Sequence, residues 1–167
     1  MEPCDLYLVR HAIAAERGDE WRDDAKRPLT ETGIARFKEV VEGLAWLDVE
    51  IDEIFTSPLV RAKQTATLLA DGLTNTVAVK TLEALAPGQP PRAVMSELSR
   101  LAKRRRIALV GHEPGLGELA AHLLGSPRAL QFKKGGVCLI TVQGLTGRRP
   151  GELAWFLPPK VLRRLPR

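Results

Sequence analysis

Cysteine, aromatic residues and long apolar runs are all scarce in this chain of 167 residues. The two cysteines, Cys4 and Cys138, lie far apart, so no disulfide framework is expected and both are predicted to be buried free thiols. No apolar run approaches the roughly 20 residues that a membrane-spanning helix needs. The first residues lack a basic segment followed by an apolar one, so no signal peptide is expected. These absences predict a cytoplasmic protein without membrane contact.

The charge balance is basic, with a formal net charge of +5. This excess weakly favours acidic substrates or partners. The densest basic run, residues 103–106, follows a predicted helix, and cations are favoured at helix ends by the helix dipole. Aromatic residues do not alternate with the basic runs, so no nucleic-acid partner is expected. The histidines at 11, 112 and 122 do not have the spacing of metal ligands, and no metal or cofactor is predicted.

Short apolar runs alternate with helical patterns through residue 125. The predicted strands are residues 6–9, 51–56, 76–79, 107–110, 137–142 and 153–157. The predicted helices begin near Thr30, Ser57, Arg92 and Pro114. This alternation predicts an α/β protein with three α/β/α layers and a mostly parallel central sheet, in a single domain of residues 1–167. The last two strands are separated by a Gly-rich turn and are expected to pair antiparallel at or near a sheet edge.

The first predicted strand, residues 6–9, stops at Arg10 and His11. In open α/β sheets the ligand crevice lies at the carboxyl ends of the strands, so these two side chains are expected to lie at the site. Arginine offers a planar fork of donors for phosphate oxygens, and histidine can act as a nucleophile or an acid/base near neutral pH. The pair favours phosphate chemistry, although His11 alone is compatible with a buried structural histidine.

Two further residues are predicted to reach the same edge. Arg61 lies in the first turn of a helix that follows a strand, and His112 follows the strand at 107–110. Two arginines can neutralise a phosphoryl group while one imidazole attacks phosphorus and the other donates a hydrogen bond. Taken singly, Arg61 is compatible with a surface cation and His112 with a hydrogen-bonding loop residue. Their joint placement favours phosphoryl transfer, whereas His122, in mid-helix, is expected to be structural.

Three segments resemble the motifs of the histidine phosphatase superfamily, which includes phosphoglycerate mutases and acid phosphatases. Residues 6–11 are similar to the strand and Arg-His-Gly motif that carries the nucleophile, with Ala12 in place of the usual Gly. Residues 57–66 resemble the second motif, whose Arg binds phosphate. Residues 110–114 resemble the third motif, which carries the second catalytic His. The resemblance implies a phosphoglycerate mutase-like fold in which His11 is the nucleophile.

Within the superfamily, residues 27–33 and 132–137 resemble segments of the small SixA-type phosphohistidine phosphatases. The short chain agrees with this, because mutase-type members carry longer insertions over the site. The resemblance implies a metal-independent hydrolase that removes phosphate from phosphohistidine on a signalling protein, through a covalent phospho-His11 intermediate. Arg10, Arg61 and His112 would then be both catalytic and substrate-binding. A monomer is expected.

The proton donor is an open question at this stage. Larger members supply a carboxylate between the second and third motifs, and the candidate here is Glu83, for which a role in the wall of the site or in structure is the alternative. A departing imidazole has a pKa near neutrality, unlike an alkoxide, and therefore needs less help from an acid. A weak or absent acid would favour phosphohistidine over a phosphate ester.

Two other functions stay open. The first is a phosphomonoesterase for a small phosphorylated metabolite, with specificity supplied by the first loop. The substrate-binding candidates in that loop are Asp19, Arg22, Lys26 and Arg27. The second is a phosphate-binding module without catalysis, which the presence of two histidines argues against, because binding alone does not require them.

Overall fold

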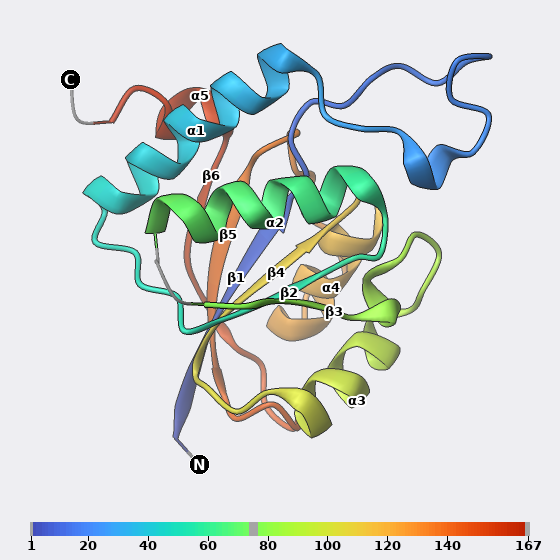
Figure 1. The fold of residues 1–167 in the computed structure, drawn as a ribbon. Helices are drawn as coiled ribbons and strands as arrows, with labels where there is room; N and C mark the ends of the chain where they lie inside the picture. Colours follow the sequence, from blue (N-terminus) through green and yellow to red (C-terminus); the bar gives the residue numbers. More distant parts are fainter. Residues whose placement is uncertain (1, 74–76, 166–167) are drawn as a thin grey trace.

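A mixed sheet forms the centre of the computed structural model, which describes residues 2–73 and 77–165 (Figure 1). Within these residues the sheet has six strands in the order β3-β2-β4-β1-β5-β6. The strands are β1 (Pro3–Arg10), β2 (Glu53–Thr56), β3 (Val79–Thr81), β4 (Arg106–Gly111), β5 (Val137–Gln143) and β6 (Glu152–Leu157). Neighbours from β3 to β1 pair parallel, whereas β5 is antiparallel to β1 and to β6. The predictions of a mostly parallel sheet and of a C-terminal hairpin at its edge are confirmed.

Helices cover both faces of the sheet, as predicted for a three-layer α/β/α protein. They are α1 (Glu31–Trp46), α2 (Val60–Leu73), α3 (Pro91–Leu101), α4 (Gly115–Leu124) and α5 (Pro159–Leu162), with short 3₁₀ turns η1 (Asp24–Lys26) and η2 (Glu83–Leu85). The helices α1, α2 and α5 pack on one face and α3 and α4 on the other (Figure 1). The sequence pattern did not predict α5, a single turn in the Pro-rich tail.

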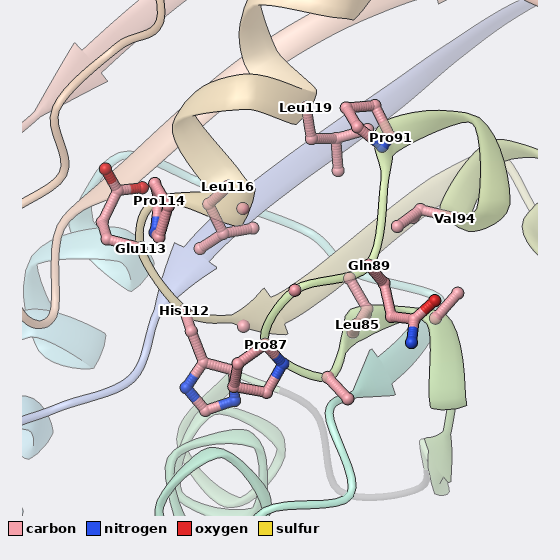
Figure 2. Close-up of a pocket in the computed structure, with 15 residues that line it drawn as sticks. Leu85, Pro87, Gln89, Pro91, Val94, His112, Glu113, Pro114, Leu116 and Leu119 are labelled. Carbon is pink, nitrogen blue, oxygen red and sulfur yellow. The ribbon is translucent and has the colours of Figure 1, made fainter.

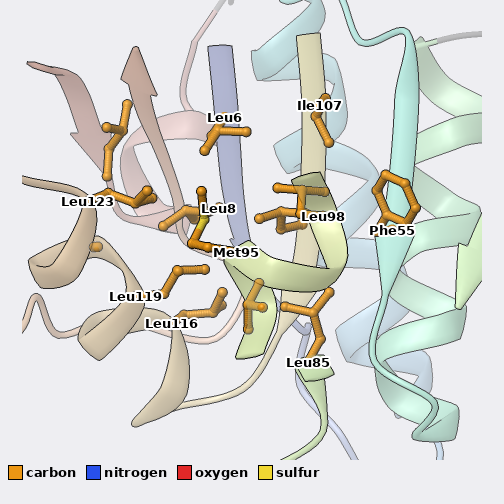
Figure 3. Close-up of a cluster of buried hydrophobic side chains, with 14 of the residues drawn as sticks. Leu6, Leu8, Phe55, Leu85, Met95, Leu98, Ile107, Leu116, Leu119 and Leu123 are labelled. Atoms are coloured by element: carbon orange, nitrogen blue, oxygen red, sulfur yellow. The ribbon is translucent and has the colours of Figure 1, made fainter. Parts of the chain in front are cut away.

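Alternation along the strands divides the core into two halves. In β1, Leu6 and Leu8 contact the cluster under α3 and α4, whereas Tyr7 and Val9 contact the cluster under α1 and α2. Successive strand side chains point to opposite faces, so a strand that is apolar throughout is buried on both sides. Figure 3 shows the α3–α4 half, where Leu98 and its neighbours pack on the central strands. The central strands are therefore packed against side chains on both faces of the sheet.

Several predicted boundaries are confirmed and two are wrong. Thr30 caps α1, because its side chain accepts a hydrogen bond from the amide of Gly33. The helix α2 begins at Val60 rather than at Ser57, whose amide still donates to Val110 across the sheet, at 2.9 Å. The third strand lies at Val79–Thr81 rather than at 76–79; residue 76 lies outside the described residues. Because β3 is a short edge strand with polar residues, its sequence resembles that of a loop, and its position was therefore predicted incorrectly.

The scarce residue types lie where the sequence suggests. Cys4 and Cys138 are buried free thiols, as predicted, and burial raises their pKa values to about 11 and about 12. No helix in the described part of the chain is long and apolar enough to span a membrane.

Candidate active site

The carboxyl ends of three neighbouring strands meet at one edge of the sheet. The amide of His11, after β1, donates to the carbonyl of Gly111 in β4 at 3.0 Å. His112 follows β4 directly, and Arg61 lies in the first turn of α2. Arg10, His11, Arg61 and His112 all line one cleft of about 420 Å³. The structure thus brings together the four residues that the sequence pattern singled out.

The ring of His11 is held in one tautomer. Its Nδ1 lies 2.7 Å from the carbonyl oxygen of Ala12. A carbonyl only accepts hydrogen bonds, so Nδ1 carries the proton and Nε2 keeps a free lone pair. Burial, followed by the nearby cations Arg61 and Arg10, lowers the pKa of His11 to about 4. The ring is neutral at pH 7, as a nucleophile must be.

The ring of His112 is held by another strand end. Its Nε2 lies 2.7 Å from Oγ of Ser57, and that hydroxyl accepts a hydrogen bond from the amide of Leu59 at 3.3 Å. The hydroxyl proton can therefore go to Nε2, which leaves the proton of the neutral ring on Nδ1. Burial, followed by the charges of His11 and Arg61, lowers the pKa of His112 to about 3. The two histidine rings lie 5.1 Å apart between centroids.

Three buried nitrogen atoms of the cleft residues have no hydrogen-bond partner: Arg10 Nε, Arg61 Nε and His112 Nδ1. Buried donors are almost always satisfied in folded proteins, so each exception needs an explanation. Three such donors on residues lining one cleft fit a multi-oxygen anion, which can accept all of them at once. A tetrahedral phosphoryl group is such an anion, and His11 lines the same cleft as these three residues.

The segment before β5 holds the end of β1 in place. The carbonyl of Phe132 accepts a hydrogen bond from Nη1 of Arg10 at 2.7 Å. The amide of Gly135 lies 3.1 Å from the carbonyl oxygens of both Arg10 and His11. Gly135 has a φ of +81°, a conformation that favours glycine. Residues more than 100 positions away in the sequence therefore hold the backbone at Arg10 and His11 and the side chain of Arg10.

The remaining predicted residues divide into two groups. Arg27 lines the cleft and is 7% exposed, with Nη1 2.7 Å from the carbonyl of Ala15. The structure does not bring the others to the cleft, and all of them are exposed: Asp19, Arg22, Lys26 and Glu83. Five charged residues that line the cleft were not among the predicted ones: Glu16, Arg17, Asp24, Glu113 and Lys134. In the described residues no three His, Cys, Asp or Glu side chains are grouped as metal ligands.

Glu113 lies between the cleft and a smaller side pocket of about 30 Å³ (Figure 2). Both cavities share Pro87, His112 and Glu113, and the side pocket is otherwise mainly apolar, with Leu116 on its wall. An oxygen of the Glu113 carboxylate accepts a hydrogen bond from the amide of Gly117 at 2.9 Å. Burial raises the pKa of this carboxyl group above its usual range. The cleft lining therefore includes an acidic residue next to His112 in the sequence, although its carboxylate points away from the His112 ring, toward the first turn of α4 (Figure 2).

The fold agrees with comparisons to known proteins. A model described as histidine phosphatase superfamily (branch 1) matches residues 6–86. An uncharacterized protein of Picosynechococcus sp. is 38% identical over 137 residues, which cover 80% of this chain and 82% of that one. The chain belongs to the histidine phosphatase superfamily.

Similarity to individual members covers almost the whole chain. Phosphohistidine phosphatase SixA of Escherichia coli is 26% identical over 156 residues, or 92% of this chain and 93% of that one. A solved structure of the protein histidine phosphatase SixA with tungstate matches with a TM-score of 0.82 at 25% identity, over 95% of this chain and 99% of that chain. A mycobacterial glucosyl-3-phosphoglycerate phosphatase shares the fold, with a TM-score of 0.70 at 17% identity, over 94% of this chain and 100% of that chain.

Proposed function

We propose that this protein hydrolyses phosphohistidine on a protein, through a covalent intermediate on His11 and without a metal ion. The observation that carries the proposal is the set of three unpartnered donors on residues lining the same cleft as a neutral histidine. The similarity to SixA over nearly the whole chain supports the substrate class. A role in cytoplasmic signal transduction follows from that substrate.

The reaction would proceed in two steps. In the first, Nε2 of His11 forms a bond to phosphorus as the bond from phosphorus to the substrate imidazole breaks. A phosphohistidine protonated on its second ring nitrogen leaves as neutral imidazole and needs no acid. In the second step, water attacks phosphorus and releases phosphate from His11. Arg10, Arg61 and His112 donate hydrogen bonds to the phosphoryl oxygens as their charge develops.

The shape of the cleft supports a substrate presented by a folded partner. Its rim contains Arg17, whose side chain is 80% exposed, together with exposed Pro87 and Lys134. The reacting groups lie deeper, and His11 and His112 are each 5% exposed. A projecting phosphorylated side chain can therefore reach His11 from the surface.

A second candidate function is hydrolysis of a small phosphate ester. Glu113 favours it, because an alkoxide leaving group needs a proton and this carboxyl group has a raised pKa on the wall of the cleft. The fold is also shared by a phosphatase named for a small metabolite, the mycobacterial glucosyl-3-phosphoglycerate phosphatase.

A side-by-side assay with a phosphohistidine peptide and para-nitrophenyl phosphate, in EDTA, distinguishes the two candidates. We expect the peptide to be preferred. Glu113→Gln should lower ester hydrolysis by about 100-fold or more, the usual size of a general-acid effect, and affect peptide hydrolysis less. Glu83→Gln is the matched control, because this exposed carboxylate lies outside the cleft. A preference for the ester that depends on Glu113 would favour the second candidate, and loss of activity in EDTA would refute the metal-free mechanism.

A further inference from the structure

The loop before α1 places a carboxylate directly against the phosphate-binding candidate Arg61. Nη2 of Arg61 lies 3.0 Å from Oδ2 of Asp24, and Nη1 lies 2.8 Å from the backbone carbonyl oxygen of the same residue. The Arg61 side chain is 3% exposed, and Asp24 lines the cleft beside it. A carboxylate at this position would compete with a substrate phosphate for the same guanidinium group. Its presence therefore suggests a role of its own.

The hydrogen bonds of Arg61 suggest that role. A guanidinium group has five N–H donors in a rigid plane. Asp24 accepts from the two terminal nitrogens, while Nε is buried and has no partner. Asp24 thus occupies the end of the guanidinium fork and leaves its side, formed by Nε and one remaining hydrogen of Nη2, for another acceptor. A phosphoryl group can bind this side with two oxygens.

Asp24 is itself fixed by a second buried arginine. Its Oδ1 lies 3.1 Å from Nε and 3.0 Å from Nη2 of Arg27, and 3.4 Å from Nε of Arg17. Burial alone would raise the pKa of Asp24, but the hydrogen bonds and charges of Arg61 and Arg27 outweigh it and lower this pKa, so the group is ionised at neutral pH. The orientation of the Arg61 guanidinium is therefore fixed by Asp24, which is itself held by an ion-pair network with Arg27 and Arg17.

Asp24 also reduces the positive charge of the cleft. The lining residues include five cations and three carboxylates, which gives a net charge of +2 with both histidines neutral. This matches one phosphoryl dianion. Without Asp24 the net charge would be +3, which would favour retention of the phosphate product.

We propose that Asp24 is a positioning residue that presents the side of the Arg61 guanidinium to the phosphoryl group and limits affinity for free phosphate. The proposal rests on phosphoryl transfer at this site, which is part of the proposed function, but not on phosphohistidine as the substrate. The proposal predicts that neutralising the Asp24 carboxylate lowers kcat but strengthens the binding of free phosphate.

The test is Asp24→Asn, which keeps the size of the side chain and removes its charge. Kinetics with the better of the two substrates above give kcat and KM, and inhibition by inorganic phosphate gives its Ki. We expect kcat to fall by about tenfold or more, the range for weakening one transition-state interaction, while Ki for phosphate becomes lower. A kcat within twofold of the wild type would overturn the proposal, and so would parallel losses of kcat and phosphate affinity in a variant that melts like the wild type.

Two further variants keep the test decisive. Asp23→Asn is the matched control, because the exposed side chain of Asp23 caps η1 through the amide of Ala25 and does not line the cleft. It should have wild-type kcat and Ki. Asp24→Glu keeps the charge but moves it by one methylene, so kcat should fall while Ki stays at the wild-type value; wild-type kcat in Asp24→Glu would refute the positioning role even if Asp24→Asn did not fold. Turnover that survives His11→Ala would refute the proposed function instead, whatever Asp24 does.

Discussion

His11 and His112 occupy equivalent places after neighbouring parallel strands, yet their rings are held by different kinds of groups. Nδ1 of His11 is bound to a backbone carbonyl of the next residue, which can only accept. Nε2 of His112 is bound to the hydroxyl of Ser57, which can donate or accept. The first arrangement fixes one tautomer of His11. The second allows Nε2 of His112 either to accept a hydrogen bond from the hydroxyl or to donate one to it. The difference is compatible with the roles that we propose, with His11 as the nucleophile and His112 as a hydrogen-bond donor.

The largest effect is expected at His11. His11→Ala should lower turnover by at least about 1,000-fold, because no other group lining the cleft replaces the lone pair at Nε2. Mass spectrometry of the quenched wild type should find phosphate on the peptide that contains His11. His122→Ala is the matched control, because His122 lies in α4 and lines a different cavity. Phosphate trapped on His112 instead would reverse the assignment of the two histidines.

A smaller loss is expected at the second histidine. His112→Ala should lower kcat by about 100-fold, the usual range for removing a transition-state donor. The phosphorylated enzyme should still form on His11, but slowly, and rapid quenching of a single turnover measures this. Formation at the wild-type rate would show that His112 does not contribute to the first step.

The contact between Ser57 and His112 sharpens the comparison further. Ser57→Ala leaves Nε2 of His112 buried without a partner, so kcat should fall by about fivefold, which corresponds to the loss of one hydrogen bond of roughly 1 kcal/mol. In a His112→Ala background the same substitution should have no further effect. The exposed Ser99, which bonds to Ser96 in α3, provides the control Ser99→Ala. An equal loss in both backgrounds would mean that Ser57 acts independently of His112.

The smallest change is expected between pH 7 and pH 5.5. Folded-state pKa values near 4 for His11 and 3 for His112 leave both rings neutral in this range, so kcat/KM should change less than about threefold once substrate ionisation is considered. Stability should nevertheless fall below pH 6.5, because unfolded histidines bind protons first, and this loss should continue to about pH 3, where His112 protonates in the folded state. NMR titration of the histidine Cε1–H signals, assigned with His→Gln variants, checks both values. Midpoints near 6.5 for both rings would contradict the burial argument.

The sequence predicted those site residues that follow regular elements. Arg10, His11 and His112 follow buried apolar strands, and Arg61 lies in the first turn of a helix with an apolar stripe. Such patterns are local, and parallel strands bring their ends to one edge without further information. The order of strands and helices alone is therefore enough to predict that these four residues lie at one edge of the sheet.

The groups that orient those residues had little or no local pattern. Asp24 lies in a polar loop without periodicity, and its relation to Arg61 depends on how that loop folds over α2. Phe132 contributes a backbone carbonyl, which any residue carries. Charge alone was also misleading in the first loop, where Arg27 is buried in the cleft but Arg22 and Lys26 point to solvent.

The catalytic centre and the walls of its cleft come from different kinds of structure. The backbone at His11 is held by the sheet and by Gly135, whereas the walls include residues of the loop at 14–27 and Pro87 in the loop after η2. Surface loops tolerate changes of length far better than strands do. Provided that Asp24 and Arg27 are retained, these two connections can be exchanged as modules. We expect such exchanges to change which phosphorylated groups reach His11 without altering the strand ends that hold it.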